Sequence, residues 1–316
     1  MGAVRMSKAL RWGFLAIAVA LLGWAVVSQW DAVSASLRDL TWGAIVGALA
    51  ACIVALGINA MSWRAVMRAI GLKATVPEAM RVFLLSQIGK YVPGSVWPVL
   101  AQAEFARDHG VSRPRAMTGS IVAMVVGVVT AAIVGSAGLV LAVPGALAAY
   151  WWVLVVAAGL ATMLVPPVLA RLVALAFRLT RRTEEPARIG AGPLLASAAW
   201  SVLMWAVLGL HAWLLLRELA PGSDLLLATG AFAFAWLVGF LVVIAPAGAG
   251  AREAALVLAL GSVATPAQAL SLALVSRFLM TAADVAGLGA GIAIGARRRG
   301  PAATARAASP EAPPEA

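Results

Sequence analysis

Residues 116–140 read AMTGSIVAMVVGVVTAAIVGSAGLV, an apolar run without a charged residue. A run of this length can cross the hydrocarbon core of a bilayer as an α-helix, which takes about 20 residues. Similar runs lie at residues 12–27, 42–61, 150–170, 194–216 and 225–245. Residues 246–295 predict two further crossings, the first of them discontinuous. We therefore predict an all-α, polytopic helical membrane protein with about eight transmembrane crossings and one or two broken or re-entrant helices.

The composition of the whole chain agrees with this class. Of its 316 residues, 63% are apolar and 12% are charged, whereas soluble domains have about 45–50% and about 25%. A large soluble catalytic domain is therefore excluded. We expect residues 1–295 to form one transmembrane domain. Residues 296–316, rich in Ala, Pro, Ser and Glu, are expected to form a disordered cytoplasmic tail.

The basic residues predict the orientation of the chain. The net charge is +11, and most Lys and Arg residues lie in short segments between apolar runs, including the loop 171–193. Positive residues stay on the cytoplasmic side of membrane proteins. We therefore predict a multi-pass membrane protein, with an even number of crossings and with both termini in the cytoplasm. This charge pattern is not that of a nucleic-acid-binding surface.

Two apolar segments are interrupted by glycine and proline. The first, 82–103, contains Gly89-Lys-Tyr-Val-Pro-Gly94 and has basic residues on both sides, which predicts a re-entrant hairpin. The second begins Pro246-Ala-Gly-Ala-Gly-Ala251 and continues with Arg252 and Glu253. Interrupted segments in the two halves of a chain are typical of a transporter's binding site.

A helix that restarts after each break would present free N–H groups and its positive dipole end. Lys90 and Arg252 adjoin the breaks, so the expected ligand is an anion such as a phosphate. Purely structural roles for these charged residues remain open as alternatives. Lys90 could extend to the interface, Arg252 could pair with Glu253, and Arg277 with Asp284 could hold one helix to its neighbours. Glu104 could form an ion pair with Arg107, three residues later on a helix, or could transfer protons if it faces a cavity.

Other chemistry is poorly represented. The single cysteine, Cys52, and the two separated histidines, His109 and His211, have no spacing typical of metal ligands. No nucleotide-binding or nucleophile-elbow motif is found. We expect no bound cofactor, no metal site, no catalytic residue and no enzymatic activity. The Gly287–Gly291 pattern in an apolar helix predicts close helix packing.

The two interrupted motifs resemble those of the transmembrane region of lysylphosphatidylglycerol synthase, also called the flippase-like family. The matching stretches are Gly89-Lys-Tyr-Val-Pro-Gly-Ser-Val-Trp-Pro98 and Pro246-Ala-Gly-Ala-Gly-Ala-Arg-Glu-Ala-Ala-Leu256, the latter followed by Ser276-Arg277. The resemblance covers about residues 11–295 and implies a multi-pass protein of the bacterial inner (plasma) membrane. It implies substrate-binding roles for Lys90, Tyr91, Pro93, Gly94, Gly248, Gly250, Arg252 and Glu253. Gating or coupling is expected from Glu104, Arg277 and Asp284.

The resemblance implies a lipid translocase for an anionic or aminoacylated phospholipid, without the aminoacyl-tRNA-dependent transferase. Two alternatives remain. The chain could transport, or assist the transport of, polyprenyl-phosphate-linked sugars beside a separate glycosyltransferase or lipid synthase. It could also be a membrane enzyme acting on a lipid phosphate. The segment 118–138 has no charge where an acidic-basic pair is expected from many members.

Overall fold

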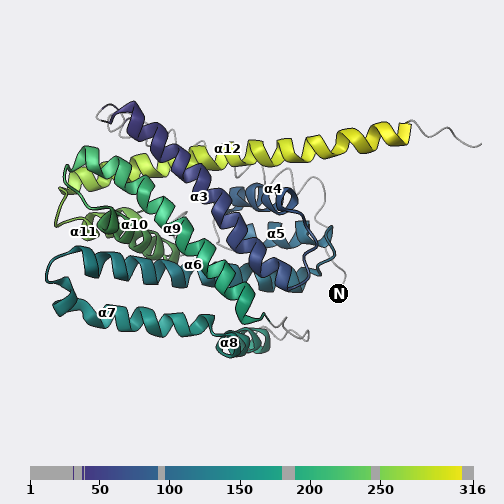
Figure 1. Cartoon of the computed structure of the whole chain (residues 1–316), viewed down its shortest axis with the longest axis horizontal. Helices are drawn as coiled ribbons and strands as arrows, with labels where there is room; N and C mark the ends of the chain where they lie inside the picture. The colour runs from purple at the N-terminus through teal and green to yellow at the C-terminus, as the bar shows by residue number, and fades with distance from the viewer. Residues whose placement is uncertain are drawn as a thin grey trace, which may run out of the picture.

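The computed structural model describes residues 40–91, 97–179, 189–242 and 250–307, together with residues 31 and 38. All regular structure in these ranges is helical (Figure 1). Side chains are described up to residue 175 in the helix that ends at 179, and up to 296 in the last helix. The predicted all-α class is confirmed, and the predicted first span, 12–27, lies outside the described residues.

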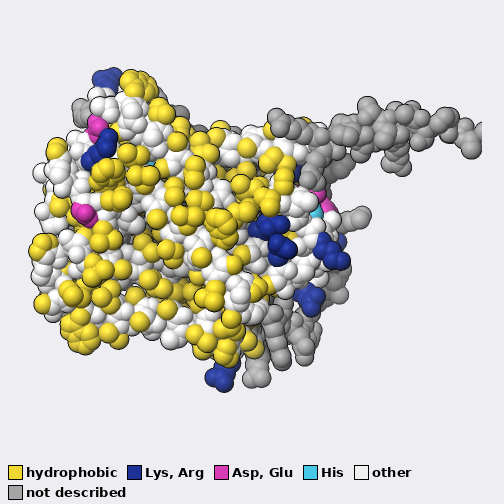
Figure 2. All heavy atoms as spheres, in the orientation of Figure 1, with side chains coloured by type: hydrophobic (Ala, Val, Ile, Leu, Met, Phe, Trp, Pro, Cys, Tyr) yellow, Lys and Arg dark blue, Asp and Glu magenta, His cyan; other side chains and the backbone are white. Residues whose placement is uncertain are grey.

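Five helices in the described part of the chain are long and apolar enough to cross a membrane. They are α3 (Trp42–Ala69), α6 (Arg113–Ala142), α7 (Ala146–Ala161) with the short η2 (Thr162–Leu164), α9 (Ala191–Leu219) and α12 (Pro266–Ala307). Figure 2 shows hydrophobic side chains across the middle of the visible face and Lys and Arg side chains toward its ends. This distribution is that of a protein immersed in a bilayer.

Helices α3 and α9 pack against each other in opposite directions. The Thr41 N–H, before α3, donates to Glu218 at the end of α9 over 3.3 Å. The Ser62 hydroxyl, near the other end of α3, contacts the Ser197 hydroxyl at the start of α9 over 3.0 Å. We call the end of the bundle that contains Ala69 and Ala191 the basic end, because Arg64, Arg68, Lys73 and Arg81 lie in this part of the chain.

The first interrupted segment folds as a hairpin that enters from the basic end. Helix α4 (Val76–Ser86) follows α3 after a short turn and continues into the short helix η1 (Gln87–Tyr91). Helix α5 (Trp97–Arg107) then runs back to the start of α6. The Trp63 indole N–H donates to Ser120 over 3.1 Å, so the end of α3 and the start of α6 are adjacent. Both ends of the hairpin therefore lie at one end of the bundle, as the sequence predicted.

The second interrupted segment forms another hairpin, which enters from the opposite end. Helix α10 (Leu225–Leu241) starts after the end of α9, and α11 (Ala251–Ala259) leads into α12. The Gln268 side chain donates to the Leu219 carbonyl over 2.5 Å, which places the start of α12 beside the end of α9. In Figure 1, α4 and α5 occupy one half of the bundle and α10 and α11 the other.

This hairpin corrects the predicted crossings. The sequence predicted residues 225–245 as one crossing and a discontinuous second one after Pro246. Instead, α10 begins and α11 ends at the same end of the bundle, because α10 follows the end of α9 and α11 leads into α12, whose start lies beside the end of α9. Helix α11 itself has only 9 residues. The described part of the chain has five helices of crossing length, and the number of about eight for the whole chain stays a prediction.

Two other boundaries differ from the prediction. The span expected at 150–170 ends early, because Val165 is extended before Pro166-Pro167 and a new helix, α8 (Pro166–Leu179), begins there. The last helix continues to Ala307, so residues 296–307 are helical where composition predicted disorder. Alanine and arginine favour helix formation, whereas Gly300 and Pro301 in the same stretch do not. Residues 308–316 lie outside the described residues.

Small residues allow the helices to approach closely. A Cβ atom on Gly138 of α6 would lie 2.5 Å from the Gly230 Cα of α10, and one on Gly287 of α12 would lie 2.8 Å from Leu56. Packing through glycine is typical of membrane helices, which gain no hydrophobic driving force from one another in lipid. The predicted packing role of the 287–291 pattern is thus confirmed at Gly287.

The hairpin arrangement predicts a labelling pattern. Single cysteines at the exposed positions Lys73 and Ser112, in a Cys52→Ala background, should react with an impermeant thiol reagent from one side only. Cysteines at the exposed Pro221 and Ser262 should react only from the other side. Labelling of Lys73→Cys and Ser112→Cys from opposite sides would show that the first segment crosses the membrane. The positive-inside rule assigns the first pair to the cytoplasm.

Candidate functional site

A cavity of about 350 Å³ lies where the two hairpins meet. Its wall includes residues of α3, α6, α9 and α12 as well as residues of both hairpins. Ligand pockets in proteins usually have about 300–1,000 Å³. The cavity is thus large enough for a headgroup, and segments about 150 residues apart in sequence contribute to it.

Aromatic side chains make up much of the wall. The Trp205 and Trp236 rings meet edge to face at 5.1 Å, and Trp236 stacks on Phe240 at 5.1 Å. The Trp205 indole N–H donates to Thr130 over 3.2 Å. Since this polar group is satisfied away from the cavity, the ring contributes an apolar surface to the wall.

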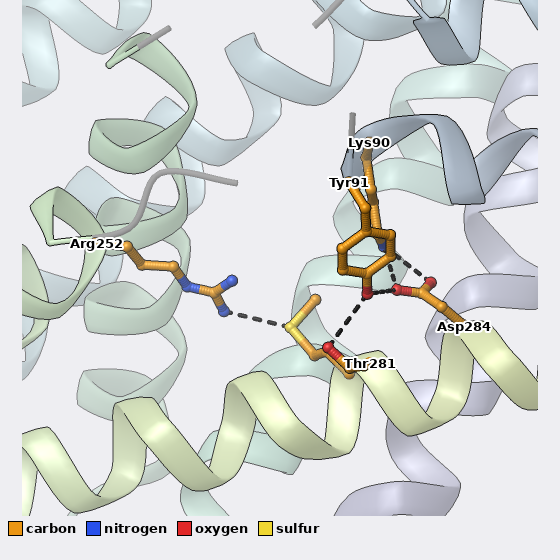
Figure 3. Close-up of polar contacts among 6 residues, drawn as sticks. Lys90, Tyr91, Arg252, Thr281 and Asp284 are labelled. Atoms are coloured by element: carbon orange, nitrogen blue, oxygen red, sulfur yellow. Dashed lines mark hydrogen bonds and ion pairs between the residues drawn. The ribbon is translucent and has the colours of Figure 1, made fainter. Parts of the chain in front are cut away.

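Lys90, Tyr91 and Asp284 form a polar cluster on one side of the cavity (Figure 3). The Lys90 Nζ lies 2.6 Å from one Asp284 carboxylate oxygen and 2.8 Å from the other. The Tyr91 hydroxyl donates to Asp284 over 2.5 Å, and the Thr281 hydroxyl lies 3.2 Å from the Tyr91 oxygen. The Asp284 side chain is only 4% exposed, so its charge depends on these partners.

Gly89 explains why Lys90 is placed here. A Cβ atom at Gly89 would lie 2.8 Å from the Pro98 nitrogen and 3.0 Å from the Trp97 carbonyl carbon. Glycine thus lets the start of α5 pack against η1, and this contact closes the hairpin. The next two residues, Lys90 and Tyr91, then reach α12 across the cavity.

Arg252 lies on the other side of the cavity, in the first turn of α11. Its guanidinium carbon lies 4.8 Å from the centre of the Phe232 ring, and one of its nitrogens lies 3.3 Å from the Met280 sulfur (Figure 3). Among the described residues, it forms no ion pair with a carboxylate. The predicted pairing with Glu253 is therefore absent, and Arg252 faces the cavity as a cation.

Glu253 instead fixes the position of α11. One of its carboxylate oxygens accepts the Gly250 N–H over 2.7 Å, and the other accepts from Arg277 of α12 over 2.9 Å. Gly250 has a φ of 83°, which favours glycine over residues with a side chain. Glu253 does not line the cavity, whereas Arg277 does. The expected role of Glu253 in substrate binding stays a prediction.

The charges around the cavity do not cancel. Lys90, Arg252 and Arg277 are positive, whereas Asp284 and Glu253 are negative, which leaves one formal positive charge. Lys90 is paired with Asp284 and Arg277 with Glu253. Among these five residues, all of them in the described part of the chain, Arg252 is therefore the cation without a carboxylate partner.

Glu104 lies away from this cavity. Its carboxylate forms ion pairs with Arg107 and Arg113, at the turn between α5 and α6. The predicted pair with Arg107 is confirmed, and Arg113 is an additional partner that sequence spacing did not indicate. Glu104 does not line the cavity, so its expected coupling role stays a prediction.

Three expected site residues, Pro93, Gly94 and Gly248, lie outside the described residues. The structure adds residues that the sequence did not single out, namely Thr281 and Met280 on α12 and Phe232 on α10. Thr281 lies between Arg277 and Asp284 at helical spacing, which was an available signal. Phe232 gave no signal, because its contact with Arg252 depends on the fold of the second hairpin.

The histidines take no part in a metal site in the described residues, where no group of three or more His, Cys, Asp or Glu side chains is found. His211 is fully buried between helices. Its Nε2 lies 2.9 Å from the Ser276 hydroxyl and its Nδ1 lies 3.0 Å from the Ala48 carbonyl. These contacts join α3, α9 and α12 behind the cavity.

The fold and the cavity define a polytopic α-helical membrane protein with two opposed re-entrant hairpins around a largely apolar cavity that contains charged side chains. Residues 12–286 match the family described as Lysylphosphatidylglycerol synthase TM region, and the chain belongs to this family. This confirms the resemblance of the two motifs and connects the chain with lipid-related membrane functions. A search of curated proteins found no match.

Proposed function

We propose that this protein is a lipid translocase that takes the anionic, phosphate-bearing headgroup of a lipid into the cavity while the apolar chains stay in the bilayer. The observation that carries the proposal is Arg252, the cavity-lining cation that has no carboxylate partner among the described residues. A charge inside a membrane protein is costly unless it has a function or a counter-ion. An anionic headgroup would supply that counter-ion.

The arrangement of the hairpins supports transport rather than static binding. One hairpin reaches the cavity from the basic end and the other from the opposite end. Opposed, interrupted segments around a central site are typical of transporters that open to one side at a time. Arg252 lies in the first turn of α11, so the positive dipole end of this helix would also favour an anion bound beside it.

The other charged residues would have distinct roles. Lys90 would bind the headgroup only by exchanging its Asp284 partner for the phosphate, so this pair would open and close the wall between the first hairpin and α12. Glu253 and Arg277 would hold α11 in place. An enzymatic reaction on the lipid phosphate has less support, since the carboxylate in the described wall, Asp284, is occupied by Lys90 and Tyr91.

Liposomes that contain the purified protein would test the proposal. Labelled phosphatidylglycerol, an aminoacylated phosphatidylglycerol and a polyprenyl-phosphate sugar should be compared with phosphatidylcholine for headgroup exchange between leaflets. We expect faster exchange of at least one anionic-phosphate or aminoacylated lipid than of phosphatidylcholine. Selective movement of the polyprenyl lipid would identify the alternative substrate class and a glycosyltransferase as the fitting partner. Equal exchange of all lipids, as in protein-free liposomes, would contradict translocation.

A further inference from the structure

Helix α8 was not expected from the sequence, and the cavity does not involve it. It begins at Pro166-Pro167, directly after Val165 adopts an extended conformation. In Figure 1, α8 is seen end-on, whereas α6 and α7 run lengthwise across the view. The chain therefore turns sharply at the end of α7, and α8 runs across the direction of the membrane-spanning helices.

One face of α8 packs on the protein at the basic end. Leu169 is 5% exposed and belongs to a hydrophobic cluster with Met67 of α3, Ala116 of α6 and Leu194 of α9. Val173, four residues after Leu169, packs against the same cluster. These contacts place α8 beside the end of α3 and the starts of α6 and α9, at the level of the basic residues.

The exposed surface of α8 carries both apolar and basic side chains, with Arg171 and Leu175 adjacent on one face. Leu172 and Leu175 are 38% and 53% exposed, so large apolar side chains point away from the protein. Arg171 is exposed, and position 178, seven residues later, lies on the same side of the helix and is also arginine. Exposed apolar and basic side chains on one helix are typical of helices that lie in the plane of a membrane interface.

From this placement we infer that α8 lies in the bilayer interface at the basic end, with Leu172 and Leu175 among the acyl chains and Arg171 bound to the phosphates of anionic phospholipids. The end of α7 next to α8 also has exposed apolar side chains, because Leu160 and Val165 are 37% and 45% exposed. Arginine binds phosphate oxygens through two parallel hydrogen bonds, which suits this contact. The inference concerns the annular lipid and does not depend on translocation through the cavity.

Depth-dependent quenching would test this position. In a Cys52→Ala background, the full chain with a single fluorescent label at Leu175→Cys is reconstituted into phosphatidylcholine vesicles. A second sample carries the label at Val155→Cys, in the middle of α7. Doxyl groups high on the lipid chain should quench the label at 175 most, whereas doxyl groups near the chain end should quench the label at 155 most. Strongest quenching of position 175 by the deep doxyl group, or none by either, would overturn the interfacial placement.

The anionic preference needs a matched comparison. The same shallow doxyl chain is offered on phosphatidylglycerol or on phosphatidylcholine at equal fraction in otherwise identical vesicles. Label at 175 should be quenched more by the phosphatidylglycerol probe, up to roughly fivefold, the preference that one basic residue near an anionic surface can confer. Arg171→Gln should reduce this difference, and label at 155 should show a smaller one. Equal quenching by the two probes at 175 would refute the role of Arg171.

Discussion

Replacing Arg252 by glutamine is expected to reduce the apparent affinity for the transported lipid about ten- to hundredfold while the protein still folds. Hydrogen bonds to charged groups contribute about 1.5–3 kcal/mol, and every 1.4 kcal/mol corresponds to about tenfold in affinity. The folded state should tolerate the change, because Arg252 has no carboxylate partner among the described residues that would be left alone. Lipid exchange in liposomes measures the first effect, and thermal unfolding in detergent measures the second.

Two further variants make this result specific. Arg252→Lys should retain part of the activity, since lysine keeps the charge but cannot bind a phosphate with two parallel hydrogen bonds. Arg217→Gln is the matched control, because Arg217 also lies over an aromatic ring, 5.0 Å from the centre of Trp213, but outside the cavity. It should transport as the wild type does. Normal transport by Arg252→Gln would show that Arg252 is a structural residue and that the phosphate site is misplaced.

The sequence predicted the long helices well because their apolar content alone determines that they are helical in a membrane. It also predicted the first hairpin, since basic residues on both sides of 82–103 fix both ends to one side. The second hairpin was not predicted in this form, because residues 225–245 are long and apolar enough to be predicted as a crossing of their own. Helix α10 packs closely on α6 through Gly138 and Gly230, and composition does not reveal such contacts between helices.

The candidate site was predicted in its residue types rather than in its pairing. Lys90, Tyr91, Arg252, Arg277 and Asp284 do line one cavity. However, the sequence treated Lys90 and Arg252 as equivalent ligands next to equivalent breaks. In the structure they differ. Lys90 pairs with Asp284, which lies 194 residues later in the sequence, whereas Arg252 forms no ion pair with its sequence neighbour Glu253. Long-range contacts of this kind are set by the topology and leave no local pattern.

This difference predicts that single changes at the Lys90–Asp284 pair will be more harmful to folding than their combination. Lys90→Gln leaves the Asp284 carboxylate, which is 4% exposed, without its cation. Breaking a fully buried ion pair by removing one partner costs about 3–5 kcal/mol, whereas removing both charges is often far less costly. The cost here should be smaller, because the Lys90 side chain is 33% exposed. Lys90→Gln and Asp284→Asn should each lower the unfolding temperature, and the double variant should recover most of the loss.

Transport should not recover with stability. If the headgroup phosphate displaces Asp284 from Lys90 during the cycle, the double variant has neither the cation that binds the phosphate nor the carboxylate that replaces it afterward. It should therefore fold nearly as well as the wild type and exchange lipid no faster than protein-free liposomes. The measurement is a double-mutant cycle on the unfolding temperature, with lipid exchange recorded for the same four proteins. Wild-type exchange by the stable double variant would mean that the pair only fastens η1 to α12, and that Arg252 binds the headgroup without Lys90.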